Sequence, residues 1–164
     1  MTKSDVLTSD KRKQAEALAR RFKSITIDKI YTSPFPRAVQ TVDILNHVTQ
    51  CHVEKSDFLK ELRRASEMIG KPIQDPTALE IKRLTVEHAH DSQWHYSDEE
   101  NLHDVLNRVR QALEVLEQEP AENILVVSHA MILRILFMVM VFGKDADHTL
   151  HHRLYRHFRM PQTG

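Results

Sequence analysis

The feature that most constrains the fold is a strand, corner and helix segment late in the chain, NILVVSHAMILRILFMVMVF, from Asn123 to Phe142. Its first part, ILVV at 124–127, is apolar without polar alternation, which is typical of a strand buried on both faces of a sheet. Ser128 and His129 interrupt the apolar run, and a second apolar stretch follows. Open α/β sheets bind ligands at such corners, beside the free N–H groups of the next helix. An anion held there would face His129.

Two other interpretations of this segment compete with a ligand site. His129 could instead serve only as a cap for the following helix. The apolar helix could also be read as a membrane span, but it covers about a dozen residues and is interrupted by Arg134. A bilayer requires ~20 apolar residues. The sequence therefore favours a core helix that covers the sheet.

Length and composition limit the class of protein. The chain has 164 residues, which suits one domain with a buried core, and its net charge is +0 at pH 7 with histidine neutral. No overall field therefore favours nucleic acid or an anionic membrane. The single cysteine, Cys51, excludes an internal disulfide framework, and the N-terminus lacks the apolar core of a signal peptide. The sequence predicts a soluble, cytoplasmic protein that binds neither nucleic acid nor membranes.

A second strand and helix corner lies earlier in the chain. The apolar pattern predicts a strand over Ile25–Thr32, which Pro34 and Pro36 end before a helix begins. Arg37 then lies in the first helical turn, where the partial positive charge of the helix N-terminus disfavours a cation. An anion sharing the site would explain why a cation stands at this position. A solvated arginine is the alternative, since an exposed charge there costs only tenths of a kcal/mol.

The remaining elements alternate between helices and strands. The patterns predict a helix from Asp10 with Thr8 or Ser9 as N-cap, a strand at Cys51–Glu54, a polar excursion at Lys55–Pro76, a helix at Thr77–His90, and an amphipathic helix from Asp98 that Pro120 ends. This order predicts an α/β fold in which helices cover a mostly parallel sheet through right-handed crossovers. Long excursions within such folds are often functional, so residues 55–76 are predicted to be lid-like.

A histidine-rich segment, HTLHHRLYRHF, follows Gly143. His148, His151 and His152 would share one helical face, which could bind a metal ion. No cysteine, aspartate or glutamate completes a strong ligand pattern, so a solvated helix is favoured. The sequence predicts no metal and no cofactor.

Three segments together resemble motifs of the histidine phosphatase superfamily, whose fold is phosphoglycerate mutase-like. The first resembles LT-xx-G-xx-QA and is present as Leu7-Thr8 and Gln14-Ala15, with Lys11 where glycine usually stands. The second resembles SP-x-x-RA-x-QT and spans Ser33 to Thr41. The third resembles VSHG-x-x-x-R and spans Val127 to Arg134, with Ala130 in place of glycine.

The resemblance implies phosphohistidine chemistry. In such enzymes the histidine of an N-terminal Arg-His-Gly motif attacks phosphorus, while arginines and a second histidine hold the phosphoryl oxygens. By resemblance Arg37 and His129 bind phosphate, together with Ser33 of the same motif as Arg37. A carboxylate of the excursion would protonate the leaving oxygen. Glu61 is the first candidate for this acid, and Glu67 is the second.

The sequence departs from the family in one respect, because no Arg-His-Gly triplet occurs in the 164 residues. The resemblance therefore implies one domain over 1–164 that is incomplete at both ends, lacks the first and last strands, and keeps about three. One hypothesis is a phosphomonoester hydrolase whose nucleophile lies outside this chain. The other is a non-catalytic module that binds phosphoesters or a partner. The expected ligand is a phosphorylated small molecule or a phosphoprotein, and a homodimer covering a free sheet edge is a further hypothesis.

Overall fold

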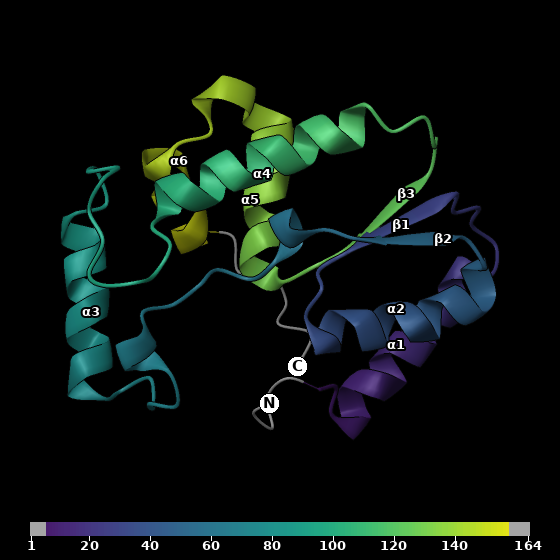
Figure 1. Cartoon of the computed structure of the whole chain (residues 1–164), viewed down its shortest axis with the longest axis horizontal. Helices are drawn as coiled ribbons and strands as arrows, with labels where there is room; N and C mark the ends of the chain where they lie inside the picture. The colour runs from purple at the N-terminus through teal and green to yellow at the C-terminus, as the bar shows by residue number, and fades with distance from the viewer. Residues whose placement is uncertain (1–5, 158–164) are drawn as a thin grey trace.

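The structure, a computed structural model, describes residues 6–157 and is built on a small parallel sheet (Figure 1). The strands are β1 (Lys29–Thr32), β2 (His52–Lys55) and β3 (Ile124–Val127), in the order β2-β1-β3. In the central strand, Thr32 lies opposite Lys55 of β2 and Val127 of β3. All three strands therefore end at the same edge of the sheet.

Helices cover both faces of this sheet (Figure 1). On one face lie α1 (Ser9–Phe22) and α2 (Pro36–Thr49), and on the other lie α4 (Leu102–Glu117) and α5 (Ala130–Phe142). Buried alanines, Ala15 and Ala19 on α1 and Ala38 on α2, are small enough to let these two helices approach closely. The predicted α/β class with a layered, parallel sheet is confirmed. Two further helices, α3 (Pro76–Glu87) and α6 (His148–His157), lie away from the strands.

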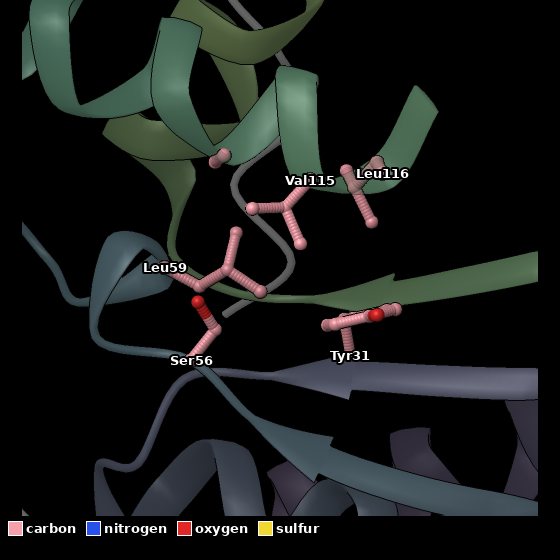
Figure 2. A pocket seen from close by; sticks show the side chains of 6 residues that line it. Tyr31, Ser56, Leu59, Val115 and Leu116 are labelled. Atoms are coloured by element: carbon pink, nitrogen blue, oxygen red, sulfur yellow. The ribbon is translucent and has the colours of Figure 1, made fainter. Parts of the chain in front are cut away.

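The main core lies between α4 and α5. It contains Val105, Leu106, Val109, Ile132, Ile135, Leu136, Met138, Val139 and Ala146. A smaller cluster joins the sheet to α4, and Figure 2 shows Tyr31, Leu59, Val115 and Leu116 around a hollow there. Its volume is about 10 Å³, which is room for one water at most. This hollow is therefore a packing feature and not a ligand site.

Several element boundaries differ from the predictions. β1 begins at Lys29 and not at Ile25, because Ile25 continues the turn that ends α1, where its N–H donates to Phe22 O at 3.1 Å. α4 begins at Leu102 and not at Asp98, because Asp98 is occupied elsewhere: its carboxylate accepts from Ser66 N at 2.8 Å. The predicted α3 ends three residues early, at Glu87.

The burial of β3 also differs from the expectation. Its four residues are each only half-buried, whereas a run of this kind was expected to be buried on both faces. Within residues 6–157, β1 is the only strand that pairs with it, so the opposite edge of β3 has no neighbouring strand. The next helix, α5, buries one side but leaves Phe137, Met140 and Val141 more than half exposed.

None of the helices in the described part of the chain combines the length and the apolar character needed to span a membrane. The helix that suggested such a reading, α5, has 13 residues and supplies much of the core.

The N-terminus of α4 is fixed by a buried asparagine. Asn101 Oδ1 accepts from Asp104 N at 3.0 Å, and Asp104 returns the bond by accepting from Asn101 N at 2.9 Å. The Asn101 amide also donates to the carbonyls of Ser92 and Trp94. One side chain thus caps the helix and holds the preceding loop.

We expect Asn101→Ala to lower the free energy of unfolding by about 2 kcal/mol, because it removes the cap and leaves two loop carbonyls unpaired. Urea titration monitored by circular dichroism would measure this loss. Asn107→Ala, an exposed change in the same helix, serves as the control and should stay within about 0.5 kcal/mol of the wild type. Equal stability of the two variants would contradict the role assigned to Asn101.

Candidate functional site

Strand pairing brings the two predicted corners together. β1 and β3 end side by side, with Thr32 opposite Val127, and the N–H of Ser33 donates to Val127 O at 3.0 Å. The segment from Ser33 to Arg37 therefore lies against the segment from Ser128 to Ala130. Residues about ninety positions apart in the sequence share one edge of the sheet.

The centre of this corner is a hydrogen-bonded chain of three side chains. Arg37 Nε and Nη2 lie 3.2 and 2.9 Å from His129 Nδ1, and His129 Nε2 lies 2.8 Å from Ser33 Oγ. A guanidinium can only donate, so Nδ1 must accept and the ring proton of the neutral histidine sits on Nε2. His129 Nε2–H therefore donates to Ser33 Oγ. The tautomer follows from the partners on both sides of the ring.

The environment keeps His129 uncharged. Its side chain is buried, and burial, Arg37 and Arg108 together lower the pKa of His129 to about 4. Near pH 7 the ring is neutral and the positive charge of the corner resides on Arg37. A bound anion would offset this charge and could accept hydrogen bonds from both side chains.

Two helices begin at the same corner without side-chain caps. The N-cap residues are Phe35 for α2 and His129 for α5, and neither side chain accepts a hydrogen bond from its helix. The first turn of a helix lies at its positive end. At α5 the first N–H groups have no partner within the helix, whereas at α2 Pro36 has no N–H and Ala38 N donates to Phe35 O at 2.9 Å. Both features favour an anion, in addition to the guanidinium of Arg37.

An open cleft of about 640 Å³ adjoins this corner. Its charged and polar lining includes Lys11, Arg21, Arg37, Glu61, Ser128 and His129. Among the described lining residues there are three permanent cations and one carboxylate. The cleft is therefore electropositive although the whole chain has no net charge.

The structure brings together most of the side chains that the sequence analysis singled out. Arg37, Glu61 and His129 all line the cleft. Ser33 is fully buried and is not part of the lining, but its hydroxyl is hydrogen-bonded to His129, which is. Glu67 also lies outside the lining, where its carboxylate accepts from Ser97 Oγ at 2.7 Å.

The start of the 55–76 excursion is packed beside this site. Arg108 Nη1 donates to the carbonyls of Phe58 and Lys60, and Ser128 Oγ donates to Leu59 O at 2.7 Å. These bonds fix the residues just before Glu61. The lid-like character of the whole excursion stays a prediction.

Three residues at or near the site were not predicted from the sequence: Lys11, Arg21 and Arg108. A signal for the first two exists in the spacing of α1, since Lys11, Gln14, Leu18 and Arg21 follow a helical repeat and all line the cleft. Nothing in the sequence pattern indicated Arg108. It pairs with Glu100, and it reaches the site only through bonds to backbone carbonyls about fifty residues earlier.

The histidines of α6 do not form a metal site in the described residues. No group of three or more His, Cys, Asp or Glu side chains there is arranged to hold a metal ion. His148 instead packs against His103, with ring centroids 5.5 Å apart.

The low pKa of His129 makes stability depend on pH. The unfolded chain protonates this histidine near pH 6.5 and the folded chain only near 4, so the unfolded state binds more protons between these values. The contribution of His129 to the free energy of unfolding is therefore complete above about pH 6.5, and it is lost as the pH falls toward 4. We expect this loss to amount to about 3 kcal/mol. Urea titrations from pH 7.5 to 4.5 would measure the free energy of unfolding against pH, and His129→Gln should remove this part of its slope.

His95→Gln is the matched control. Its hydrogen bond to Asp104 raises the pKa of His95, so its contribution is present at low pH and is lost as the pH rises. The two variants should therefore change the slope in opposite directions. An unchanged slope in His129→Gln would contradict the neutral, buried state of His129.

Comparison with known proteins identifies the family. A model of the histidine phosphatase superfamily (branch 1) matches residues 3–157. No curated protein sequence matches the chain significantly.

Solved structures share the fold at low sequence identity. The α-ribazole phosphatase of Shigella flexneri superposes with a TM-score of 0.69 at 21% identity, covering 95% of this chain and 74% of that chain. YhfR of Bacillus stearothermophilus gives a TM-score of 0.67 at 19% identity, covering 87% of this chain and 70% of that chain. A mycobacterial glucosyl-3-phosphoglycerate phosphatase in complex with inorganic phosphate gives a TM-score of 0.66 at 20% identity, covering 88% of this chain and 73% of that chain. Because the family model matches nearly all of the sequence, the chain belongs to the histidine phosphatase superfamily.

Proposed function

We propose that this chain binds the phosphoryl group of a phosphomonoester at the corner of Arg37 and His129 and serves phosphatase chemistry of the phosphohistidine type. The observation that carries the proposal is the pair of bonds from Arg37 to His129 Nδ1. They hold a guanidinium at the starts of two uncapped helices, in an electropositive cleft. Arg37 has five N–H donors, so others remain for phosphoryl oxygens.

Each neighbouring side chain has a proposed role. His129 would turn its Nε2–H from Ser33 to a phosphoryl oxygen when the ligand enters. Ser33 would then act as a positioning residue that holds the ring in the empty site. Glu61 would be the acid that protonates the leaving oxygen, and its place in the cleft lining favours it over Glu67.

The nucleophile is proposed to lie outside these 164 residues. In a phosphohistidine mechanism, a histidine nitrogen forms the bond to phosphorus while the bond to the leaving oxygen breaks, and water later cleaves the phosphohistidine. His129 is poorly suited to attack, because Nδ1 accepts from Arg37 and Nε2 carries the proton. No Arg-His-Gly triplet is present in the sequence.

The same observation supports a second candidate function. An anion site without a nucleophile would suit a module that binds phosphoesters without turnover. The two candidates differ only in whether hydrolysis follows when a nucleophilic histidine is supplied. A phosphorylated small molecule is the proposed ligand in both cases. A phosphoprotein ligand, a homodimer and a cytoplasmic location stay predictions from the sequence.

Phosphate binding tests the site directly. We expect Arg37→Ala to weaken the binding of inorganic phosphate by about tenfold to a hundredfold, the usual range for a hydrogen-bonded charge. Isothermal titration calorimetry would measure the change, with circular dichroism to verify folding. Arg12→Ala removes an exposed arginine from α1 outside the cleft and should bind as the wild type does. Equal affinity of Arg37→Ala and the wild type would contradict the proposed site.

Hydrolysis of an aryl phosphate tests the position of the nucleophile. We expect the 164-residue chain to show no turnover above that of the Arg37→Ala, His129→Ala double variant. We further expect turnover once a segment carrying an Arg-His-Gly motif is joined upstream. Turnover by the chain alone would show that one of its own groups attacks phosphorus. Binding without turnover in the extended protein would favour the non-catalytic module.

A further inference from the structure

An ion pair at the start of α4 holds the backbone that leads to Glu61. Arg108 Nε and Nη2 donate to Glu100 Oε1 and Oε2 at 2.8 and 3.0 Å, so the pair is bidentate. Arg108 Nη1 donates to the carbonyls of Phe58 and Lys60 at 2.7 and 2.8 Å. One guanidinium thus joins the ion pair to two carbonyls within three residues of Glu61.

The carboxylate of the pair also holds the backbone that follows Glu61. Glu100 Oε2 accepts from Arg63 N at 2.9 Å, and Glu100 N donates to Arg63 O at 3.0 Å. Between these fixed points, Leu59 is buried and Leu62 packs against the main core. Glu61 is left with its side chain in the cleft lining, where it is the only carboxylate among the described residues.

The pair is enclosed, and its donors are nearly all used. The side chains of Arg108 and Glu100 are only 16% and 18% exposed. The bonds above occupy four of the five N–H donors of Arg108, which is not part of the cleft lining. Arg108 is therefore suited to holding the segment of Glu61 and not to binding a ligand.

The held segment adjoins the phosphate corner. Ser128 Oγ donates to Leu59 O at 2.7 Å, and Ser128 directly precedes His129 in the chain. An acid has to lie within hydrogen-bond reach of the atom that it protonates, so a small displacement of Glu61 would matter. The position of its backbone depends on the ion pair.

We propose that Arg108 and Glu100 are positioning residues, which hold Glu61 so that its carboxyl group faces the bound phosphoryl group. This inference rests on the proposed function, because it assigns Glu61 the role of acid at the phosphate corner. Neither member of the pair touches the phosphomonoester. The alternative is a pair that serves packing alone and leaves the action of Glu61 on the ligand unaffected.

The test measures how strongly Glu61 acts on a bound phosphomonoester. Phenyl phosphate would be titrated into the 164-residue chain by calorimetry at about pH 8.5, where carboxylates and phosphomonoesters are both ionised. Glu61→Gln removes the like charge and has the shape of the protonated acid. We expect it to tighten binding about threefold to fivefold, as for charges that remain partly solvated.

Arg108→Lys then tests the positioning. Lysine retains the positive charge, but its single ammonium cannot reach Glu100 and both carbonyls as the planar guanidinium does. In this background Glu61→Gln should no longer tighten binding, because Glu61 is no longer held beside the ligand. A pair that serves packing alone would lower the stability and leave the effect of Glu61→Gln at its wild-type size. That result would overturn the inference.

Arg110→Lys is the matched control. Arg110 is a half-buried arginine of the same helix that also binds a backbone carbonyl, Ala146 O at 2.7 Å, and it does not line the cleft. In this background Glu61→Gln should tighten binding as it does in the wild type. Loss of the effect here as well would show that any disturbance of α4 releases Glu61, and would overturn the specific role of the pair.

Glu100→Gln is a second variant that keeps the test decisive if circular dichroism shows Arg108→Lys to be unfolded. The amide N–H groups would face a donor of Arg108 and break the bidentate pair, while the amide oxygen could still accept from Arg63 N. We expect the effect of Glu61→Gln to shrink in this background too. An effect of full size would overturn the inference.

The outcomes also separate this inference from the proposed function. Binding that depends on Arg37, with equal effects of Glu61→Gln whether or not the pair is intact, would leave the phosphate corner standing and overturn the positioning. No effect of Glu61→Gln in the wild type would overturn both the positioning and the choice of Glu61 as the acid. Absence of binding, or binding independent of Arg37, would overturn the phosphate corner and this inference with it.

Discussion

The site depends above all on the parallel pairing of β1 with β3. This pairing sets Thr32 opposite Val127, and the bond from Ser33 N to Val127 O extends it one residue beyond the strands. The two following helices must then begin at neighbouring points on one edge of the sheet. Arg37 and His129 come within hydrogen-bond distance for this reason, although 92 positions separate them in the sequence. A shift of one residue in this register would turn alternate side chains to the opposite face and separate the two.

Burial and charge act together at this corner. Desolvation would make a protonated His129 costly, and the neighbouring guanidinium makes it more so, which is why the pKa of the ring falls to about 4. The ring therefore remains a neutral link between Arg37 and Ser33. The starts of α2 and α5, whose N-cap side chains accept no hydrogen bond, add the partial positive charge of two helix ends at the same place. A dianionic phosphoryl group is complementary to all of these features.

The free edge of β3 and the outer side of α5 show where local sequence and surroundings disagree. The β3 run predicts burial on both faces, yet each of its residues is only half-buried. Phe137, Met140 and Val141 of α5 are likewise exposed, although they are as apolar as the buried Ile132 and Ile135. An apolar pattern reports which surfaces favour burial, whereas the elements present in residues 6–157 decide which surfaces are covered.

The sequence by itself determined the strand at Ile124–Val127, the helices on either side of each corner, the parallel α/β class and the candidates Arg37 and His129, because these depend on local periodicity, prolines and motif spacing. The candidate Glu61 came from the resemblance of the sequence to a family. The tertiary structure alone decided three other points. Strand order placed the two corners together, side-chain packing put Ser33 behind His129 and Glu67 outside the cleft, and the approach of α1 to α2 brought Lys11 into the lining. Short-range patterns carry no information about such contacts, because their energies arise between residues that only the folded chain brings together.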